Sequence, residues 1–355
     1  MNLRRNMLIP AAALVLLVSS CNYLDVSDQL AGGLQNTDEV FENVSYTKRW
    51  YASIFTGIPD YSGLNSTNVN GFKNPWASIC DELVTGYGNA SKYNNSDKNA
   101  TNVSFHRYGD CYKAIRQANI FLQKAHVITA GGTQGDELLE PELKRYQANA
   151  RFMRAFYHYL LFEQYGPIII VGDKVYEATE SQDMSRNSVD EVVEYLDKEL
   201  LASADELSQE PIIDENYRAE PTKGVALAVR AKMWVYAASP LLNGGFNEAL
   251  NIANPDGKKL FPIADAAKWE RARQACADFI NYANENNRYE LYYAAPEKNG
   301  VVNPEKSVYE LFQKYTKEII WATATADWGG LDGDAFDRRI VPRTCLLYTS
   351  DAADE

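Results

Sequence analysis

Regularly spaced apolar residues, closed off by strong stop signals, constrain the fold of this chain more than any other feature. Residues 112–122 place apolar side chains three or four positions apart: Ile115, Ala118, Phe121 and Leu122. Residues 146–165 repeat this spacing, and Gly166-Pro167 directly afterwards cannot continue a helix. Because such spacing is one face of an α-helix, both segments are predicted to be amphipathic helices.

Three more helices are predicted from their starting residues. Ser188 and Glu191 form a capping box, in which each side chain bonds the other residue's backbone N–H, and an apolar stripe continues through Leu201. Thr222 opens a helix that runs through residue 236, and Asp265 caps one that runs through residue 282.

These helices pair most simply as antiparallel hairpins. Stacked hairpins form an α-solenoid of the tetratricopeptide type, and Ala148-x-x-x-Phe152 resembles part of that repeat, although the chain has no strict repeat period. The expected fold class is therefore mostly all-α, built from tetratricopeptide-like helical hairpins.

The first 20 residues predict a cleavable export signal. Arg4 and Arg5 precede an apolar run from Met7 to Val18, and Ser19-Ser20-Cys21 supplies small residues before a cysteine. The run would span only about 18 Å as a helix, too short to cross a bilayer. We expect Cys21 to carry a lipid anchor, and the alternative is a buried N-terminal helix.

Residues 345–355 follow no helix or strand pattern that continues from the residues before them. The string resembles translated sequencing-adapter read-through, so we expect this tail to be non-native and the natural protein to be longer.

Charge and cysteine content limit the function classes. A formal net charge of −13 opposes docking on nucleic acid. Apart from Cys21 and Cys345, the cysteines are Cys80, Cys111 and Cys276, and none forms a close pair, so metal and redox motifs are absent. A disulfide between Cys80 and Cys111 and separately buried thiols are the two alternatives.

No common catalytic motif occurs. The sequence lacks G-x-S-x-G, H-E-x-x-H, a P-loop and G-x-G-x-x-G, and we expect no enzyme activity, no cofactor and no metal. His158 lies within a predicted amphipathic helix, where a structural or surface role is expected and not catalysis. Paired catalytic carboxylates remain an alternative, because a glycosidase brings its acids together only in the fold.

Several stretches, in this order, resemble the SusD/RagB family, the surface nutrient-binding lipoproteins of Bacteroidetes. They are Cys21-Asn-Tyr-Leu-Asp25, Tyr112 to Leu122, Ala150 to Tyr157 with Tyr165-Gly-Pro167, and Pro221-Thr222 with Ala231. The resemblance covers about residues 21–330 and implies a SusD-like helical binding domain over residues 21–344, incomplete at its C-terminus. It also implies four tetratricopeptide-like hairpins below a long, loop-rich ligand face.

The candidate ligand-binding residues lie in loops. Residues 60–107 are rich in Asn, Ser, Gly and aromatics and have little helical period, which predicts a long surface loop region. Sugars need flat rings for stacking and polar groups for hydrogen bonds. Such groups are Trp76, Asp81, Tyr87, Asn89, Arg107 and the adjacent Tyr108, and later Tyr292, Tyr293 and Trp328. The alternative is that each aromatic packs under its own loop.

From the resemblance we expect a lipid-anchored protein of the outer membrane, exposed at the cell surface. It would capture an oligosaccharide or polysaccharide and deliver it to a SusC-like TonB-dependent transporter, on which it docks as a lid. The alternatives are a RagB-like peptide-binding protein and a surface glycoside hydrolase.

Overall fold

Helices form nearly all the regular structure of the described chain. The computed structural model describes residues 37–59, 106–129, 137–176, 180, 183–296, 300–311 and 313–322. The α-helices are α2 (Thr37–Phe41), α3 (Val44–Ile54), α6 (Tyr108–Lys124), α7 (Glu140–Tyr165), α8 (Val189–Glu206), α9 (Lys223–Ala238), α10 (Ala267–Asn284) and α11 (Pro304–Leu311). Short 3-10 helices are η1 (Phe55–Gly57), η2 (Ala249–Asn251) and η3 (Glu285–Asn287). Within these ranges, β-structure is limited to isolated bridges.

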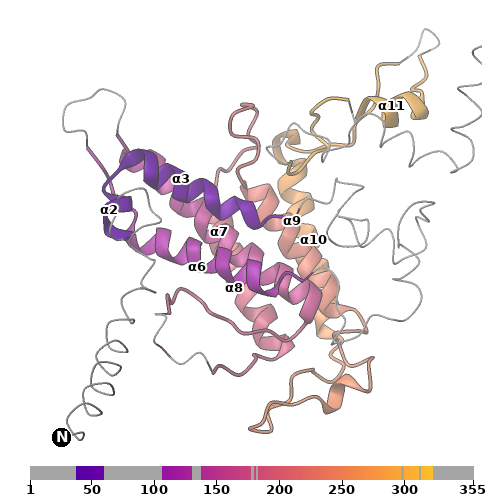
Figure 1. Ribbon diagram of the computed structural model, residues 1–355. Helices are drawn as coiled ribbons and strands as arrows, with labels where there is room; N and C mark the ends of the chain where they lie inside the picture. The colour runs from indigo at the N-terminus through magenta and orange to yellow at the C-terminus, as the bar shows by residue number, and fades with distance from the viewer. Residues whose placement is uncertain are drawn as a thin grey trace, which may run out of the picture.

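Each long helix packs against the next one in the sequence (Figure 1). The backbone N–H of Arg107, at the start of α6, donates to the hydroxyl of Tyr165, at the end of α7, so these helices run antiparallel. Packing continues from α7 to α8, α9 and α10, and α3 lies on α6. This confirms the predicted all-α fold of tetratricopeptide-like hairpins.

The helix ends follow the local sequence closely. Gly166 ends α7 with a φ of 68°, a left-handed conformation that glycine adopts at little cost. Ser188 and Glu191 form the predicted capping box of α8. The prediction for Asp265 was displaced by one residue: the N-cap position is Ala266, while the Asp265 carboxylate accepts from the N–H of Ala267 at 2.9 Å.

The helix α7 lies at the centre of the packing. It contacts α3, α6, α8 and α9, and side chains are buried around most of its circumference. The sequence pattern identified the stripe containing Phe152 and Phe156, but Tyr157 and Leu161 on another face are fully buried too. In the described ranges, no helix is both long enough and apolar enough to cross a membrane.

Buried ion pairs join the helices across this core. Arg154 on α7 donates to Glu199 on α8 at 2.8 Å. Although burial raises the pKa of Glu199, the bond from Arg154 holds it below its usual range. Where α9 packs against its two neighbours, Arg230 of α9 bonds Asp197 of α8 at 2.6 Å and Asp278 of α10 at 2.7 Å. These pairs fix the helices relative to one another.

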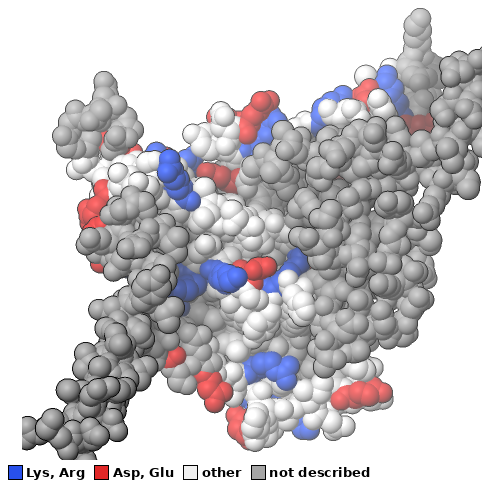
Figure 2. Space-filling view, in the orientation of Figure 1, with Lys and Arg blue, Asp and Glu red and all other residues white. Residues whose placement is uncertain are grey.

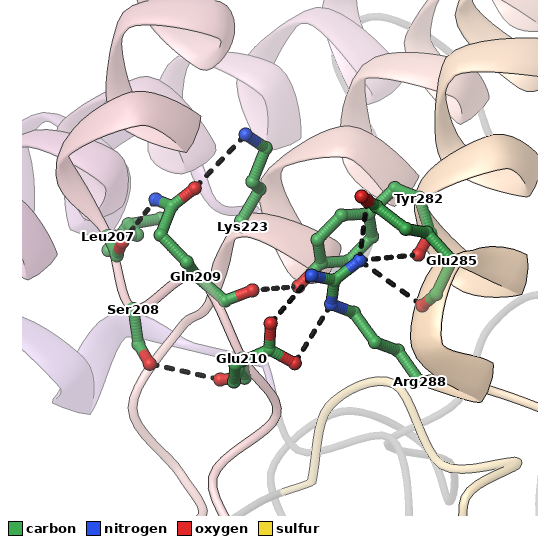
Figure 3. Close-up of polar contacts among 8 residues, drawn as sticks. All are labelled: Leu207, Ser208, Gln209, Glu210, Lys223, Tyr282, Glu285 and Arg288. Atoms are coloured by element: carbon green, nitrogen blue, oxygen red, sulfur yellow. Dashed lines mark hydrogen bonds and ion pairs between the residues drawn. The ribbon is translucent and has the colours of Figure 1, made fainter.

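A second polar cluster ties the end of α10 to the segment that follows α8 (Figure 3). Arg288 binds the Glu210 carboxylate through two nitrogens, at 2.9 and 2.6 Å, and also bonds Glu285 at 2.8 Å. The hydroxyl of Tyr282 donates to the carbonyl of Gln209 at 2.7 Å. The cluster thus ties the loop between α8 and α9 to the end of α10.

Candidate functional site

Most of the predicted ligand-binding residues lie outside the described residues. These are Trp76, Asp81, Tyr87, Asn89 and Trp328. The predicted lipid-bearing Cys21 and the predicted tail 345–355 lie outside them too, as does the 60–107 loop except for its last two residues. Arg107, Tyr108, Tyr292 and Tyr293 are described. Tyr108 lines one cavity, and Tyr292 and Tyr293 line another.

One cavity, here called the α6 cavity, lies along the N-terminal half of α6. Its volume is about 580 Å³, within the range of small-molecule sites. The described residues that line it are Tyr108, Gly109, Tyr112, Arg116, Ile169, Val171, Lys174, Tyr176 and Met184.

Aromatic rings form one side of the α6 cavity. Tyr108 meets Tyr112 edge to face with ring centroids 4.7 Å apart, and meets Tyr165 in the same way at 5.5 Å. Tyr108 is 40% exposed, so part of its ring is open to a ligand. Rings held by edge contacts with a free surface are suited to stacking on the C–H face of a sugar.

Residues 169–176 supply another part of the lining, here called the wall, and side chains of α6 hold them in place. The Tyr112 hydroxyl donates to the carbonyl of Ile169 at 2.8 Å and accepts from its N–H at 3.1 Å. The Asn119 amide donates to the carbonyls of Gly172 and Lys174, each at 3.0 Å. The wall is therefore fixed by side-chain hydrogen bonds in place of a β-ladder.

The buried His158 of α7 supports the same wall. Its Nδ1 donates to the carbonyl of Arg154 at 2.8 Å, which leaves Nε2 to accept from the N–H of Val171 at 3.3 Å. Burial lowers the pKa of His158 to about 4, so the ring is neutral at physiological pH. The structural role predicted for His158 is thus seen in its contacts.

The described lining of the α6 cavity carries positive charge and no carboxylate. Arg116 donates to the carbonyl of Tyr176 at 2.7 Å. The Lys174 ammonium lies 4.2 Å from the centre of the Tyr176 ring and 3.4 Å from Glu180, outside the lining. Figure 2 shows that, on this face of the molecule, described charges of both signs are interspersed among uncharged residues.

The other cavity, here called the C-terminal cavity, has a volume of about 540 Å³ and is lined by residues 290–293 and 314–317. The Tyr293 side chain is 66% exposed. The cations of this lining are paired: Lys314 lies 2.8 Å from Glu310, and Lys317 lies 3.7 Å from Glu290.

The two cavities share no described lining residue. Arg107 is not among the lining residues of either, and its backbone instead joins α6 to α7. Sequence reasoning missed Tyr112, Arg116 and Tyr176. Tyr112 and Arg116 could have been predicted from the sequence, because positions 108, 112 and 116 are spaced four residues apart and therefore share one helix face.

The described residues contain no cluster of side chains suited to a metal ion. Cys111 is buried with a free thiol, and burial raises the pKa of this thiol to about 11. Cys80, its partner in the disulfide that the sequence left open, lies outside the described residues.

Two solved structures share this fold. BT4246 is 24% identical with a TM-score of 0.53, and the match covers 75% of this chain and 45% of that one. A SusD-like protein (BF3747) from Bacteroides fragilis NCTC 9343 is 19% identical with a TM-score of 0.52, and the match covers 80% and 45%. This chain thus spans less than half the length of either.

No curated protein matches the sequence. A family model does: SusD-like, described as starch-binding and associating with the outer membrane, matches residues 35–235, more than half of the 355-residue chain. The chain therefore belongs to the SusD-like family, as the sequence resemblance predicted.

Proposed function

We propose that this protein is a cell-surface glycan-binding lipoprotein that captures an oligosaccharide or polysaccharide and delivers it to a SusC-like TonB-dependent transporter in the outer membrane. The family description, starch-binding and associated with the outer membrane, supports glycan binding in that location. The proposal extends this description to a specific site, an anchor and a partner.

The α6 cavity is the observation that carries the proposal. It combines the half-open ring of Tyr108 with hydrogen-bond donors on Arg116 and Lys174 in a space of about 580 Å³. Residues 169–176 of its wall are already bonded to α6 and α7, so binding costs little conformational entropy for ordering them. The 60–107 loop candidates, among them Trp76 and Asp81, precede α6 in the chain and are proposed to extend this site.

In this proposal the protein binds the glycan without hydrolysing it. A glycosidase needs two acids beside the scissile bond, and no described carboxylate residue lines the α6 cavity. The C-terminal cavity supplies the exposed ring of Tyr293, which we propose as a further contact for the glycan.

Calorimetric titration of the full chain, purified in detergent, against plant, host and microbial polysaccharides and a peptide digest tests the binding function. We expect one class of glycan to bind and to be recovered at its original length. If only peptides bind, the RagB-like alternative replaces the proposal, and if the glycan is shortened, the hydrolase alternative does.

The anchor and the partner have separate tests. Radiolabelled fatty acid should enter the wild-type chain and not a Cys21→Ala variant, because the thiol is the proposed attachment point. A SusC-like transporter encoded beside this gene should co-purify with the protein from outer membranes. Absence of label, or purification without any transporter, would remove the corresponding part of the proposal.

A further inference from the structure

We infer that the α6 cavity selects a glycan with negatively charged sugar units, such as uronic acids or sulfated sugars. This inference rests on the proposed function and narrows its ligand class. It derives from the placement of Arg116 and Lys174 in the lining without an accompanying carboxylate.

The charge of Arg116 is not neutralised within the described part of the protein. Its one hydrogen bond there joins a guanidinium nitrogen to the carbonyl of Tyr176 at 2.7 Å, and no described carboxylate pairs with it. The side chain is exposed, so its remaining N–H groups are accessible. A guanidinium with free N–H groups binds a carboxylate or sulfate in a planar, two-point geometry.

Lys174 in the wall adds a second positive charge. Its ammonium packs over the Tyr176 ring at 4.2 Å and has Glu180 at 3.4 Å, in a pair that is half exposed. An exposed pair of this kind is weak, so a ligand anion within the cavity can compete with Glu180 for the ammonium.

The rest of the protein makes this lining unusual. The chain carries a net charge of −13, and each lysine that lines the C-terminal cavity has a carboxylate within 4 Å, as Lys174 does. Arg116 differs, because its bond within the described residues goes to a carbonyl. The excess of positive charge in the lining of the α6 cavity is therefore not a consequence of the composition of the chain. It lies beside Tyr108 and Tyr112, so one sugar ring can stack while its acidic group meets the cations.

The test compares charged glycans with neutral versions of the same chains. Oligosaccharides of several uronic acids are titrated beside their methyl esters, and sulfated oligosaccharides beside their desulfated forms, into the full chain in detergent. We expect at least one charged form to bind about tenfold more tightly than its neutral counterpart. About 1 M NaCl should remove most of this preference, since the Debye length is then about 3 Å.

Three variants locate the effect. Arg116→Gln retains a donor for the Tyr176 carbonyl but lacks the charge, and Lys174→Gln removes the other charge. Each should reduce the preference for the charged form severalfold, because the charged form loses a charge-assisted bond where the neutral form loses only an ordinary hydrogen bond. Lys113→Gln is the matched control, because it removes an exposed cation from the same helix, outside the described lining, and should leave the preference intact.

Equal binding of charged and neutral glycans overturns the inference and leaves the proposed function standing, as does a preference that survives both Arg116→Gln and Lys174→Gln. Failure of every glycan to bind overturns the inference together with the proposed function.

Discussion

The α6 cavity and the C-terminal cavity have similar volumes and are both lined by tyrosines, but different kinds of contact hold their walls in place. In the α6 cavity, residues 169–176 are bonded by Tyr112, by the buried Asn119 and by the buried His158. In the C-terminal cavity, the contacts of Lys314 and Lys317 with glutamates are half exposed. The N–H of Tyr292 also donates to Glu318 beside the C-terminal cavity, in a partly buried bond of 2.7 Å. Because buried hydrogen bonds cost more to break than exposed ion pairs, the α6 cavity is the more tightly coupled of the two to the stability of the core.

This difference explains how a helical protein fixes the wall of a cavity. The α6 wall is irregular, with a turn at Gly172 and Asp173, and it has no neighbouring strand among the described residues. Several of its N–H and C=O groups therefore bond to side chains of α6 and α7. The same helices form the core through other faces. Damage to the supporting side chains should therefore reduce stability and binding together.

The largest expected effect is a loss of stability in acid through His158. Burial lowers its pKa from 6.5 to about 4, so between these values the unfolded chain binds a proton that the folded chain excludes. The contribution is complete above pH 6.5 and falls by about 3 kcal/mol as the pH drops to about 4. Denaturant unfolding across this range measures it. A His158→Gln variant that retained the same pH dependence would contradict this assignment.

The next effect is that of Asn119→Ala. The substitution leaves the carbonyls of Gly172 and Lys174 without their donor and should lower the free energy of unfolding by about 2 kcal/mol. It should also weaken glycan binding, because the wall is released. Gln123→Ala is the control: it removes an exposed bond to the carbonyl of Asp173, and its effect should stay within about 0.5 kcal/mol. Equal changes in the free energy of unfolding for the two variants would show that the buried bonds of Asn119 stabilise the protein no more than the exposed bond of Gln123.

A smaller effect, on binding alone, is expected for Tyr293→Ala. Loss of this exposed ring should weaken glycan affinity by about 1 kcal/mol, by analogy with stacked bases, and leave the unfolding curve unchanged. Because neighbouring charges in the C-terminal cavity are paired, the loss should be the same for charged and neutral glycans. Calorimetry on a charged glycan and its neutral form measures both, and unchanged affinity for both would remove Tyr293 from the site.

The smallest effect is expected for Lys314→Gln. The ion pair with Glu310 is exposed, so its loss should cause no measurable change in thermal unfolding. A clear drop in the melting temperature would mean that the C-terminal cavity is also coupled to the core.

The fold was largely predictable because the helices carry local signals. Apolar spacing, the Ser188–Glu191 box and Gly166 each act within a few residues. The helix α3 was missed because its buried face includes Thr47 and Tyr51, which a search for strictly apolar positions does not count. Its start was also marked, since the Asn43 side chain accepts from the N–H of Tyr46.

The site was less predictable than the fold. The spacing of Tyr108, Tyr112 and Arg116 on one helix face was present in the sequence, but nothing local indicates what that face meets. Residues 169–176 are placed by partners distant in sequence, such as Tyr112 and Asn119, and a single sequence does not show which polar side chains find such partners. Tertiary contacts also decide whether Arg107 lines a cavity, so its position could not be predicted from the sequence either.

The most direct test of the central claim, that the α6 cavity binds the glycan, is the affinity of a Tyr108→Ala variant measured by calorimetry with the best-binding glycan. The half-exposed ring stacks on the sugar in this account, so the variant should bind about tenfold more weakly while its unfolding temperature stays close to that of the wild type. Wild-type affinity in a folded Tyr108→Ala variant would contradict the claim.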